Sequence, residues 1–281
     1  MKPHKLIFIS LILLYACSLL TACISPGRLS AMSSTPDSFV RNTVLFDEKI
    51  YDLSGEPIKF LIRNPDDNSG IVYFNMHDNE NTSVSAVDSV LTRYTGKFIE
   101  LQFKGNRWIG GWMNDKKHFW FDPNRIYSDF GIFKTLQSYN SFTPENKKQV
   151  RIFSEYILDS LLSDANMIVA VHNNMKGYSI EKYMPDSIFE ESAAKIHYDR
   201  KNSPHDFFFV NDPTHFEYFK NLGYNAILQS QKPEDDGSLS VYCALKGIPY
   251  INVEAMEGHL EVQQKMLEDL QEILKNYRKR D

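Results

Sequence analysis

The chain has 281 residues, of which 42% are hydrophobic and 24% are charged, and its formal net charge is −5. A chain of this length and composition can bury the core of one large domain. The net charge becomes −7 once Lys2 and Lys5 are removed with the N-terminus, which argues against a nucleic acid as partner, because nucleic acids bind basic surfaces.

The N-terminus has the pattern of a secretory signal peptide. Lys2 and Lys5 precede a long apolar run that ends in small residues, which is typical of such signals. The segment Leu-Thr-Ala-Cys that ends at Cys23 resembles a bacterial lipobox. This resemblance implies a lipoprotein signal peptide over 1–22 and lipidation of the Cys23 thiol, and an uncleaved membrane anchor is the alternative. In both cases we expect a protein held on a membrane of the bacterial cell envelope, facing the periplasm or the exterior.

Residues 23–42 follow as a serine-containing polar stretch, which predicts a flexible tether. We expect the remaining residues, 43–281, to form one domain. Because Cys17 lies in the signal and Cys23 carries the lipid, this domain keeps only Cys243 and has no internal disulfide. Its stability must therefore come from an apolar core.

Apolar runs of strand length recur along the domain, and several are apolar at successive positions, as expected for strands covered on both faces. These runs are 58–63, 71–76, 97–103, 167–171, 206–210, 225–229 and 250–254, and helical patterns lie at 83–95, 143–163 and 259–279. This alternation predicts an α/β fold, a three-layer α/β/α domain with a mixed, mostly parallel sheet. In such sheets, ligands bind beyond the carboxyl ends of the strands.

Ionisable residues follow several of these apolar runs. His77 and Glu80 come after one run, His172 follows another, and Glu254 closes a third. Each residue alone is more often structural or solvated, and a polar turn explains the first pair equally well. Together, two histidines and a carboxylate match the ligands of catalytic zinc, and the remaining carboxylate could accept a proton from water.

Asn124 and Arg125 stand together after an aromatic segment. The arginine guanidinium offers a planar fork that suits a carboxylate, so this pair is a candidate anchor for an acidic group of the substrate. The alternative is that Asp122, Pro123 and Asn124 merely form a turn and that Arg125 pairs with a surface acid.

Taken in order, these motifs are similar to those of the zinc carboxypeptidase superfamily, nearest to the branch of succinylglutamate desuccinylase and aspartoacylase. The matching segments are His77-Asp-Asn-Glu80, Asp122-Pro-Asn124-Arg125, His172-Asn173 and the late Glu254.

The resemblance implies a function for each matched residue. His77, Glu80 and His172 would bind Zn²⁺, and Glu254 would act as general base on a zinc-activated water. Asn124 and Arg125 would hold a substrate carboxylate. The expected substrate is a peptide or an N-acyl amino acid with a free carboxylate, and the expected location alone suggests a cell-wall peptide.

Two residues are candidates for stabilising the carbonyl oxygen of the substrate, and the sequence does not decide between them. The desuccinylase branch places an arginine seven residues before the asparagine of the Asn-Arg pair, where this chain has Lys117. Arg107 is the other candidate. Glu257 and His259, which follow the last strand, could line the pocket or begin the final helix.

For two further segments we prefer a structural interpretation to a functional one. Trp108, Trp112 and Trp120 could bind sugar rings, but packing is the more common use of such a cluster. Residues 235–237 (Asp-Asp-Gly) predict a flexible turn.

The sequence thus predicts a membrane-anchored zinc-dependent hydrolase of amide bonds, of the carboxypeptidase or deacylase type. One alternative is an amidase that cuts the sugar–peptide amide of peptidoglycan. A second alternative is a non-catalytic lipoprotein that binds a ligand in the same pocket.

Overall fold

The computed structural model describes residues 43–113 and 117–278. The signal peptide predicted over 1–22, the tether over 23–42 and the lipidation site Cys23 lie outside the described residues. Within the two described ranges, no helix has the length and apolar composition needed to cross a membrane.

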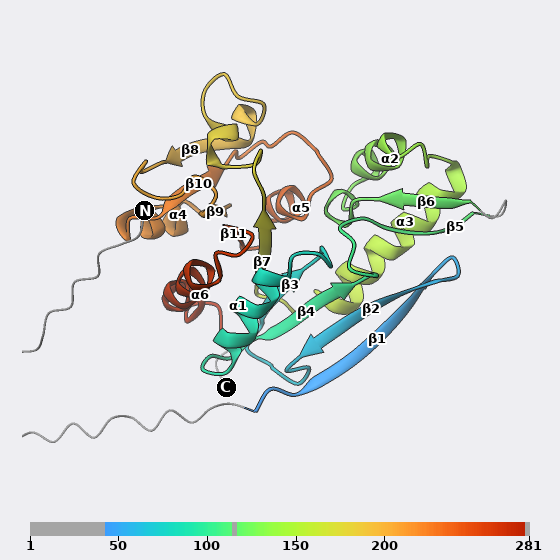
Figure 1. The fold of residues 1–281 in the computed structure, drawn as a ribbon, viewed down its shortest axis with the longest axis horizontal. Coiled ribbons are helices and arrows are strands. Elements are labelled where there is room, and N and C mark those ends of the chain that lie inside the picture. The colour runs from blue at the N-terminus through green and yellow to red at the C-terminus, as the bar shows by residue number, and fades with distance from the viewer. Residues whose placement is uncertain (1–42, 114–116, 279–281) are drawn as a thin grey trace, which may run out of the picture. The chain divides into compact units, whose positions relative to one another are not determined.

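Strands and helices alternate along most of the domain (Figure 1). The strands are β1 (Phe46–Leu53), β2 (Glu56–Arg63), β3 (Ile71–Asn75), β4 (Lys97–Gln102), β5 (Ile109–Trp112), β6 (His118–Phe121), β7 (Met167–Asn174), β8 (Ala193–His197), β9 (Phe207–Val210), β10 (Asn225–Gln229) and β11 (Tyr250–Met256). The helices are α1 (Asn81–Leu91), α2 (Asp129–Ser138), α3 (Pro144–Tyr156), α4 (Pro213–Asn221), α5 (Leu239–Lys246), α6 (Leu260–Asp269) and α7 (Gln271–Leu274).

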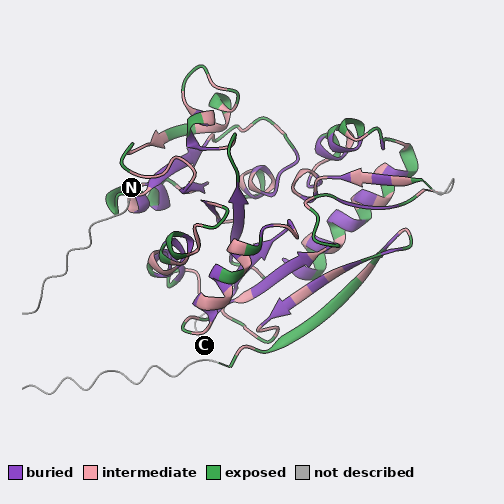
Figure 2. Ribbon diagram, viewed as in Figure 1, coloured by how far each residue is buried: buried purple, intermediate pink, exposed green. Residues whose placement is uncertain are grey.

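Most of the strands form one nine-stranded sheet in the order β1-β2-β4-β3-β7-β11-β9-β10-β8. The central strands β4, β3, β7 and β11 are parallel neighbours, whereas β1, β2 and β8 pair in the antiparallel sense. Figure 2 shows that the central strands are buried and that β1, at the edge, is largely exposed. The predicted mixed sheet with a parallel centre is confirmed.

Helices cover both faces of this sheet, so the three-layer architecture is confirmed as well (Figure 1). On one face, α1, α4 and α6 pack against the strands through residues such as Val87, Phe219 and Leu267. On the other face, α2, α3 and α5 enclose a second apolar cluster that includes Phe153 and Cys243. β5 and β6 form a separate two-stranded hairpin.

Several boundaries differ from those that periodicity predicts. α1 begins at Asn81 because Glu80 occupies the N-cap position, and the last predicted helix divides at Leu270 into α6 and α7. β1, β5, β6 and β8 were not predicted. β1 exposes most of its side chains and β5 contains Gly110 and Gly111, so neither has the continuous apolar run of a buried strand.

Candidate metal centre and active site

Three side chains meet at the carboxyl ends of β3 and β7. Nδ1 of His77 lies 2.8 Å from Oε1 of Glu80, and Nδ1 of His172 lies 2.9 Å from Oε2 of the same carboxylate. The two Nδ1 atoms are 3.3 Å apart, and all three residues are buried. The structure therefore brings together the three residues that were predicted as metal ligands.

The donor atoms fit zinc in type, and the two nitrogens also fit it in spacing. Two imidazole nitrogens and one carboxylate oxygen are common protein ligands of catalytic zinc. With bonds of about 2.0–2.1 Å, a tetrahedral zinc centre separates its ligand atoms by roughly 3.3 Å. The separation of 3.3 Å between the two histidine nitrogens matches this value, whereas the carboxylate oxygens lie closer to the nitrogens, at 2.8 and 2.9 Å, as hydrogen-bond partners do.

The secondary structure places each of the three ligands. His77 comes two residues after the end of β3, and Glu80 is the N-cap residue of α1, where the partial positive charge of the helix end favours an ionised carboxylate. His172 lies on β7, the parallel neighbour of β3. The backbone N–H of Asn173 donates to Oε2 of Glu80 at 3.0 Å and so fixes the carboxylate against β7.

Asp122 was not predicted as a site residue, although it opens the Asp-x-Asn-Arg motif. Nε2 of His77 donates to its Oδ1 at 2.9 Å, which leaves Nδ1 of His77 facing Glu80 and His172. A carboxylate on the outer nitrogen of a histidine ligand fixes the tautomer and the orientation of the ring. The position of Asp122 in the motif could have indicated a role in the site, but the same residues are equally well explained as a turn.

The charges of these residues stabilise one another. Burial alone would lower the pKa of His77, but Glu80 and Asp122 raise it. Burial alone would raise the pKa of Glu80 and that of Asp122. His77 and His172 outweigh burial and lower the pKa of Glu80, and His77 and Arg107 do the same for Asp122. Both carboxylates are therefore ionised at neutral pH.

Arg107 reaches the candidate metal ligands. Its Nη1 lies 2.8 Å from Oε1 of Glu80, and its Nη2 lies 3.6 Å from Oδ2 of Asp122. Its side chain is 39% exposed and lines the same cavity as the ligands, so the guanidinium can approach a bound molecule.

Lys117, the other candidate for this role, lies elsewhere. It is exposed and directly precedes β6, whereas Asp122 directly follows that strand. At about 3.3 Å per residue, these two positions are roughly 16 Å apart along the strand. The structure brings Arg107 to the site and leaves Lys117 at the turn end of the β5–β6 hairpin.

Glu254 lies beside His172, because the parallel register of β11 and β7 pairs these two residues. Its Oε2 accepts from Nδ2 of Asn174 at 3.1 Å, and its Oε1 accepts from Nδ2 of Asn252 at 3.2 Å. The buried carboxylate is thus held by two amides next to the candidate metal ligands. Neither asparagine was predicted as a site residue.

The Asn124-Arg125 pair lies in a short 3-10 turn that directly follows Asp122. Oδ1 of Asn124 accepts from the backbone N–H of Leu239 at 3.1 Å. Nη1 of Arg125 donates to the carbonyl oxygen of Asn124 at 2.6 Å, and its Nη2 lies 3.7 Å from the carboxylate of Asp236. A loop far along the chain therefore holds both residues.

This loop is anchored, although residues 235–237 predict a flexible turn. The backbone N–H of Tyr127 donates to the carbonyl oxygen of Gly237 at 2.9 Å, and Ser128 donates to Asp235 at 2.7 Å. A Cβ on Gly131 would lie 2.3 Å from the Cα of Gly237, so the backbones of α2 and the loop are in direct contact. The absence of side chains at two glycines permits this approach.

Replacing Gly237 with alanine should disturb the Arg125 turn. The new Cβ would lie 2.5 Å from the Cα of Gly131 and 2.7 Å from the carbonyl oxygen of Arg125, and φ of Gly237 is +75°. We expect a loss of about 1–3 kcal/mol in the free energy of unfolding, measured with denaturant. Gly223→Ala is the matched control, since φ there is +84° but no atom lies within 4 Å of the new Cβ. Equal losses in the two variants would show that the close contact is unimportant.

The candidate site residues line one cavity of about 370 Å³. Of the predicted residues, the cavity is lined by His77, Glu80, Arg107, Asn124, Arg125, His172 and Glu254. Glu257 also lines it, whereas His259 occupies the N-cap position of α6 and lies 2.9 Å from Asp206.

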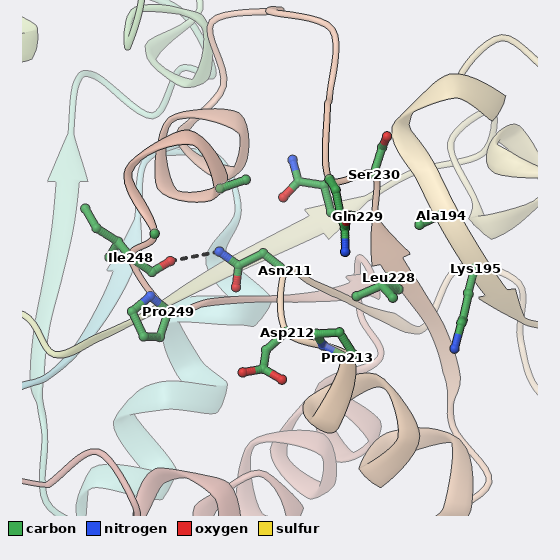
Figure 3. A pocket seen from close by; sticks show the side chains of 13 residues that line it. Ala194, Lys195, Asn211, Asp212, Pro213, Leu228, Gln229, Ser230, Ile248 and Pro249 are labelled. Atoms are coloured by element: carbon green, nitrogen blue, oxygen red, sulfur yellow. Dashed lines mark hydrogen bonds between the residues drawn. The ribbon is translucent and has the colours of Figure 1, made fainter.

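A second cavity, of about 510 Å³, lies at the carboxyl ends of β9 and β10 (Figure 3). Because β9 runs antiparallel to β11, this cavity is at the opposite edge of the sheet. Its polar side chains have structural partners: Nδ2 of Asn211 donates to the carbonyl oxygen of Ile248 at 2.8 Å, and Asp212 caps α4. No histidine or cysteine occurs among its described lining residues, so we assign the chemistry to the first cavity.

A scan of protein-family models and a search of curated proteins give no match to this chain. Among solved structures, it is similar to the succinylglutamate desuccinylase from Chromobacterium violaceum, with 14% identity, 82% of this chain and 73% of that chain covered, and a TM-score of 0.42. This structure is from the branch predicted from the motifs. The ectoine utilization protein EutE (DoeB) from Ruegeria pomeroyi is similar as well, with 12% identity, 86% and 70% of the two chains covered, and a TM-score of 0.45. The cell shape determinant Csd4 from Helicobacter pylori has 10% identity, 85% and 57% coverage, and a TM-score of 0.39.

Proposed function

We propose that this protein is a zinc-dependent amide hydrolase of the carboxypeptidase or deacylase type, held on the bacterial cell envelope by a lipid on Cys23. The observation that carries the proposal is the convergence of His77, Glu80 and His172 in a cavity that Glu254 also lines. The anchor rests on the lipobox-like sequence that ends at Cys23.

Each residue has a chemical task in this proposal. His77, Glu80 and His172 would hold the zinc ion, which acidifies water and polarises carbonyl groups when bound. Glu254 accepts a proton from the attacking water and passes it to the leaving nitrogen. The Arg107 guanidinium stabilises the negative charge that develops on the carbonyl oxygen.

Asn124 and Arg125 would recognise the substrate carboxylate. The side chain of Arg125 is 39% exposed, and its contact with Asp236 is long, at 3.7 Å, and exposed to solvent. Such an ion pair contributes little free energy, so a substrate carboxylate can replace it. The proposed substrates are therefore peptides or N-acyl amino acids with a free carboxylate, with cell-wall peptides favoured by the proposed location.

Peptides with a free C-terminus should be cleaved faster than the same peptides with an amidated C-terminus. Loss of a charge-assisted hydrogen-bond pair corresponds to a decrease in kcat/KM of about 10- to 100-fold. Arg125→Met should abolish this preference, and Arg125→Lys should restore it only in part because lysine lacks the fork. The measurements are kcat/KM for each peptide pair and the zinc content of each variant.

The outcomes separate the two parts of the proposal. Equal rates on free and amidated peptides would contradict the carboxylate anchor even if the protein contains zinc. Absence of zinc from the purified protein, together with no hydrolysis after zinc is added, would contradict the hydrolase itself.

A further inference from the structure

All three tryptophans of the chain belong to one hairpin. Trp108 directly precedes β5, Trp112 ends β5, and Trp120 lies on β6. Trp108 is 46% exposed and Trp112 is 43% exposed. Exposed apolar patches are typical of interaction sites.

The pleat of the hairpin separates buried from outward-facing rings. Phe119 and Phe121 on β6 are buried in the core, and His118 and Trp120 alternate with them. The ring of His118 stacks on that of Trp120, with centroids 5.2 Å apart, and meets the ring of Trp112 at 3.7 Å. Trp112, His118 and Trp120 therefore form one group of adjacent rings on the outer side of the hairpin, in which Trp120 is partly buried.

The hairpin approaches the candidate catalytic cavity at the start of β5. Trp108 follows the cavity residue Arg107, and its ring lies against that of Tyr139, with centroids 5.7 Å apart. Burial and Asp122 raise the pKa of Tyr139, and Arg107 and Arg125 act against them. Neither ring lines the cavity, so a molecule bound there would have to extend past Arg107 to reach Trp108.

The turn end of the hairpin carries polar groups next to the rings of Trp112 and His118. Oε1 of Glu56 lies 3.4 Å from Nε2 of His118, and its Oε2 accepts from Nζ of Lys104 at 2.7 Å. An apolar partner, such as a lipid bilayer, would bury these charged groups at a considerable cost in free energy. A sugar chain combines apolar ring faces with hydroxyl and amide groups, so it matches flat rings that are flanked by hydrogen-bonding side chains.

We propose that the tryptophan face, formed by Trp108, Trp112, His118 and Trp120, binds the sugar rings of a glycan joined to the peptide that is cut in the cavity. This inference rests on the proposed function and narrows its substrate to a sugar-bearing peptide. Trp108 holds the ring nearest the scissile amide, and Trp112 holds a ring farther along the glycan.

Tryptophan fluorescence tests the proposal directly, because every tryptophan of the chain belongs to this face. The full chain is titrated with the β-1,4-linked tetramer of N-acetylglucosamine. We expect a saturable change in emission, and we expect Trp108→Ala to weaken the apparent affinity by roughly tenfold. Trp108→Phe keeps a ring and should bind almost as well as the unaltered chain.

The matched control is Phe130→Ala, which removes a ring that is 45% exposed on α2 and lies outside the face. It should leave the titration unchanged. No saturable response of the unaltered chain to the tetramer, or equal responses of Trp108→Ala and the unaltered chain, would overturn the proposal. A shift in emission with phosphatidylglycerol vesicles but not with the tetramer would overturn it in favour of a membrane contact.

Kinetics separate this proposal from the proposed function. Trp108→Ala should raise KM for a glycopeptide by roughly tenfold and leave KM for the same peptide without sugar unchanged. Hydrolysis of both substrates with no fluorescence response would contradict the sugar site alone. A fluorescence response in a chain that hydrolyses neither substrate would contradict the proposed hydrolase and leave the sugar site standing.

Discussion

Replacing Glu254 with glutamine should slow hydrolysis by about 10²- to 10⁴-fold and leave the zinc content unchanged. Glutamine has nearly the same size as glutamate, but it cannot accept and return a proton at the reacting bond. Glu254 is not one of the three residues whose donor atoms converge, so its replacement should leave the metal in place. The checks are kcat on a free-carboxylate peptide and the zinc content by atomic absorption.

Glu257→Gln is the matched control for this variant. Glu257 lines the same cavity but is exposed and does not lie beside His172 in the sheet register. We expect its replacement to change kcat by less than about tenfold. If Glu254→Gln keeps the original rate while the Glu257 variant loses it, the general base has been assigned to the wrong carboxylate.

Replacing His77 with alanine should remove the zinc and the activity together. The variant loses one of three donor atoms, and it also leaves Asp122 without the imidazole that it orients. We expect the zinc content to fall from about one ion per chain to almost none. His197→Ala, on the edge strand β8, is the control that should keep both the metal and the rate.

The stability of the metal-free protein provides a second test of the His77→Ala variant. Glu80 and Asp122 raise the pKa of His77 against the opposing effect of burial. The protonated imidazole therefore stabilises the metal-free fold fully below about pH 6.5, the pKa in the unfolded chain, and this stabilisation is lost as pH rises through the raised pKa. Denaturant unfolding in a chelator should show His77→Ala less stable than the unaltered chain by roughly 3 kcal/mol at pH 6, with a smaller difference at pH 8.5. Zinc retained at the original content in His77→Ala would refute the assigned ligands.

The central strands could be predicted because their environment imposes a local pattern. β3, β7, β9 and β10 are buried on both faces, so each is a run of successive apolar residues. β1 and the β5–β6 hairpin have no such pattern, because one is exposed and the other pairs two glycines with aromatic residues. Their places in the structure depend on pairing partners that no short window of sequence contains.

The site residues likewise differ in whether a local sequence pattern could predict them. His77, Glu80, His172 and Glu254 could be proposed in advance because each follows or ends an apolar run, which is where a parallel sheet presents its ligand-binding side chains. The partner of His77 could not be proposed, since Asp122 lies 45 residues away and its turn has an equally good local explanation.

The choice between Arg107 and Lys117 also required the tertiary structure. Both precede the Asn-Arg pair in sequence, and their charges are equal. The β5–β6 hairpin carries one of them to Glu80 and the other to its far turn. Sequence distance to a motif is therefore a poor measure of distance in space when a hairpin lies between them.

By itself, the sequence determined the α/β class, the buried central strands and the identity of the residues that can bind a metal, because these depend on hydrophobic periodicity and on side-chain chemistry. Only the tertiary structure decided the sheet register that sets Glu254 beside His172, the contact of Gly131 with Gly237 behind Arg125, and the exposure of two tryptophans on the β5–β6 hairpin. These features arise from contacts between segments far apart in the chain, such as the hydrogen bond between Asn124 and Leu239 across 115 residues. Their free energies depend on packing and register, which local sequence patterns do not record.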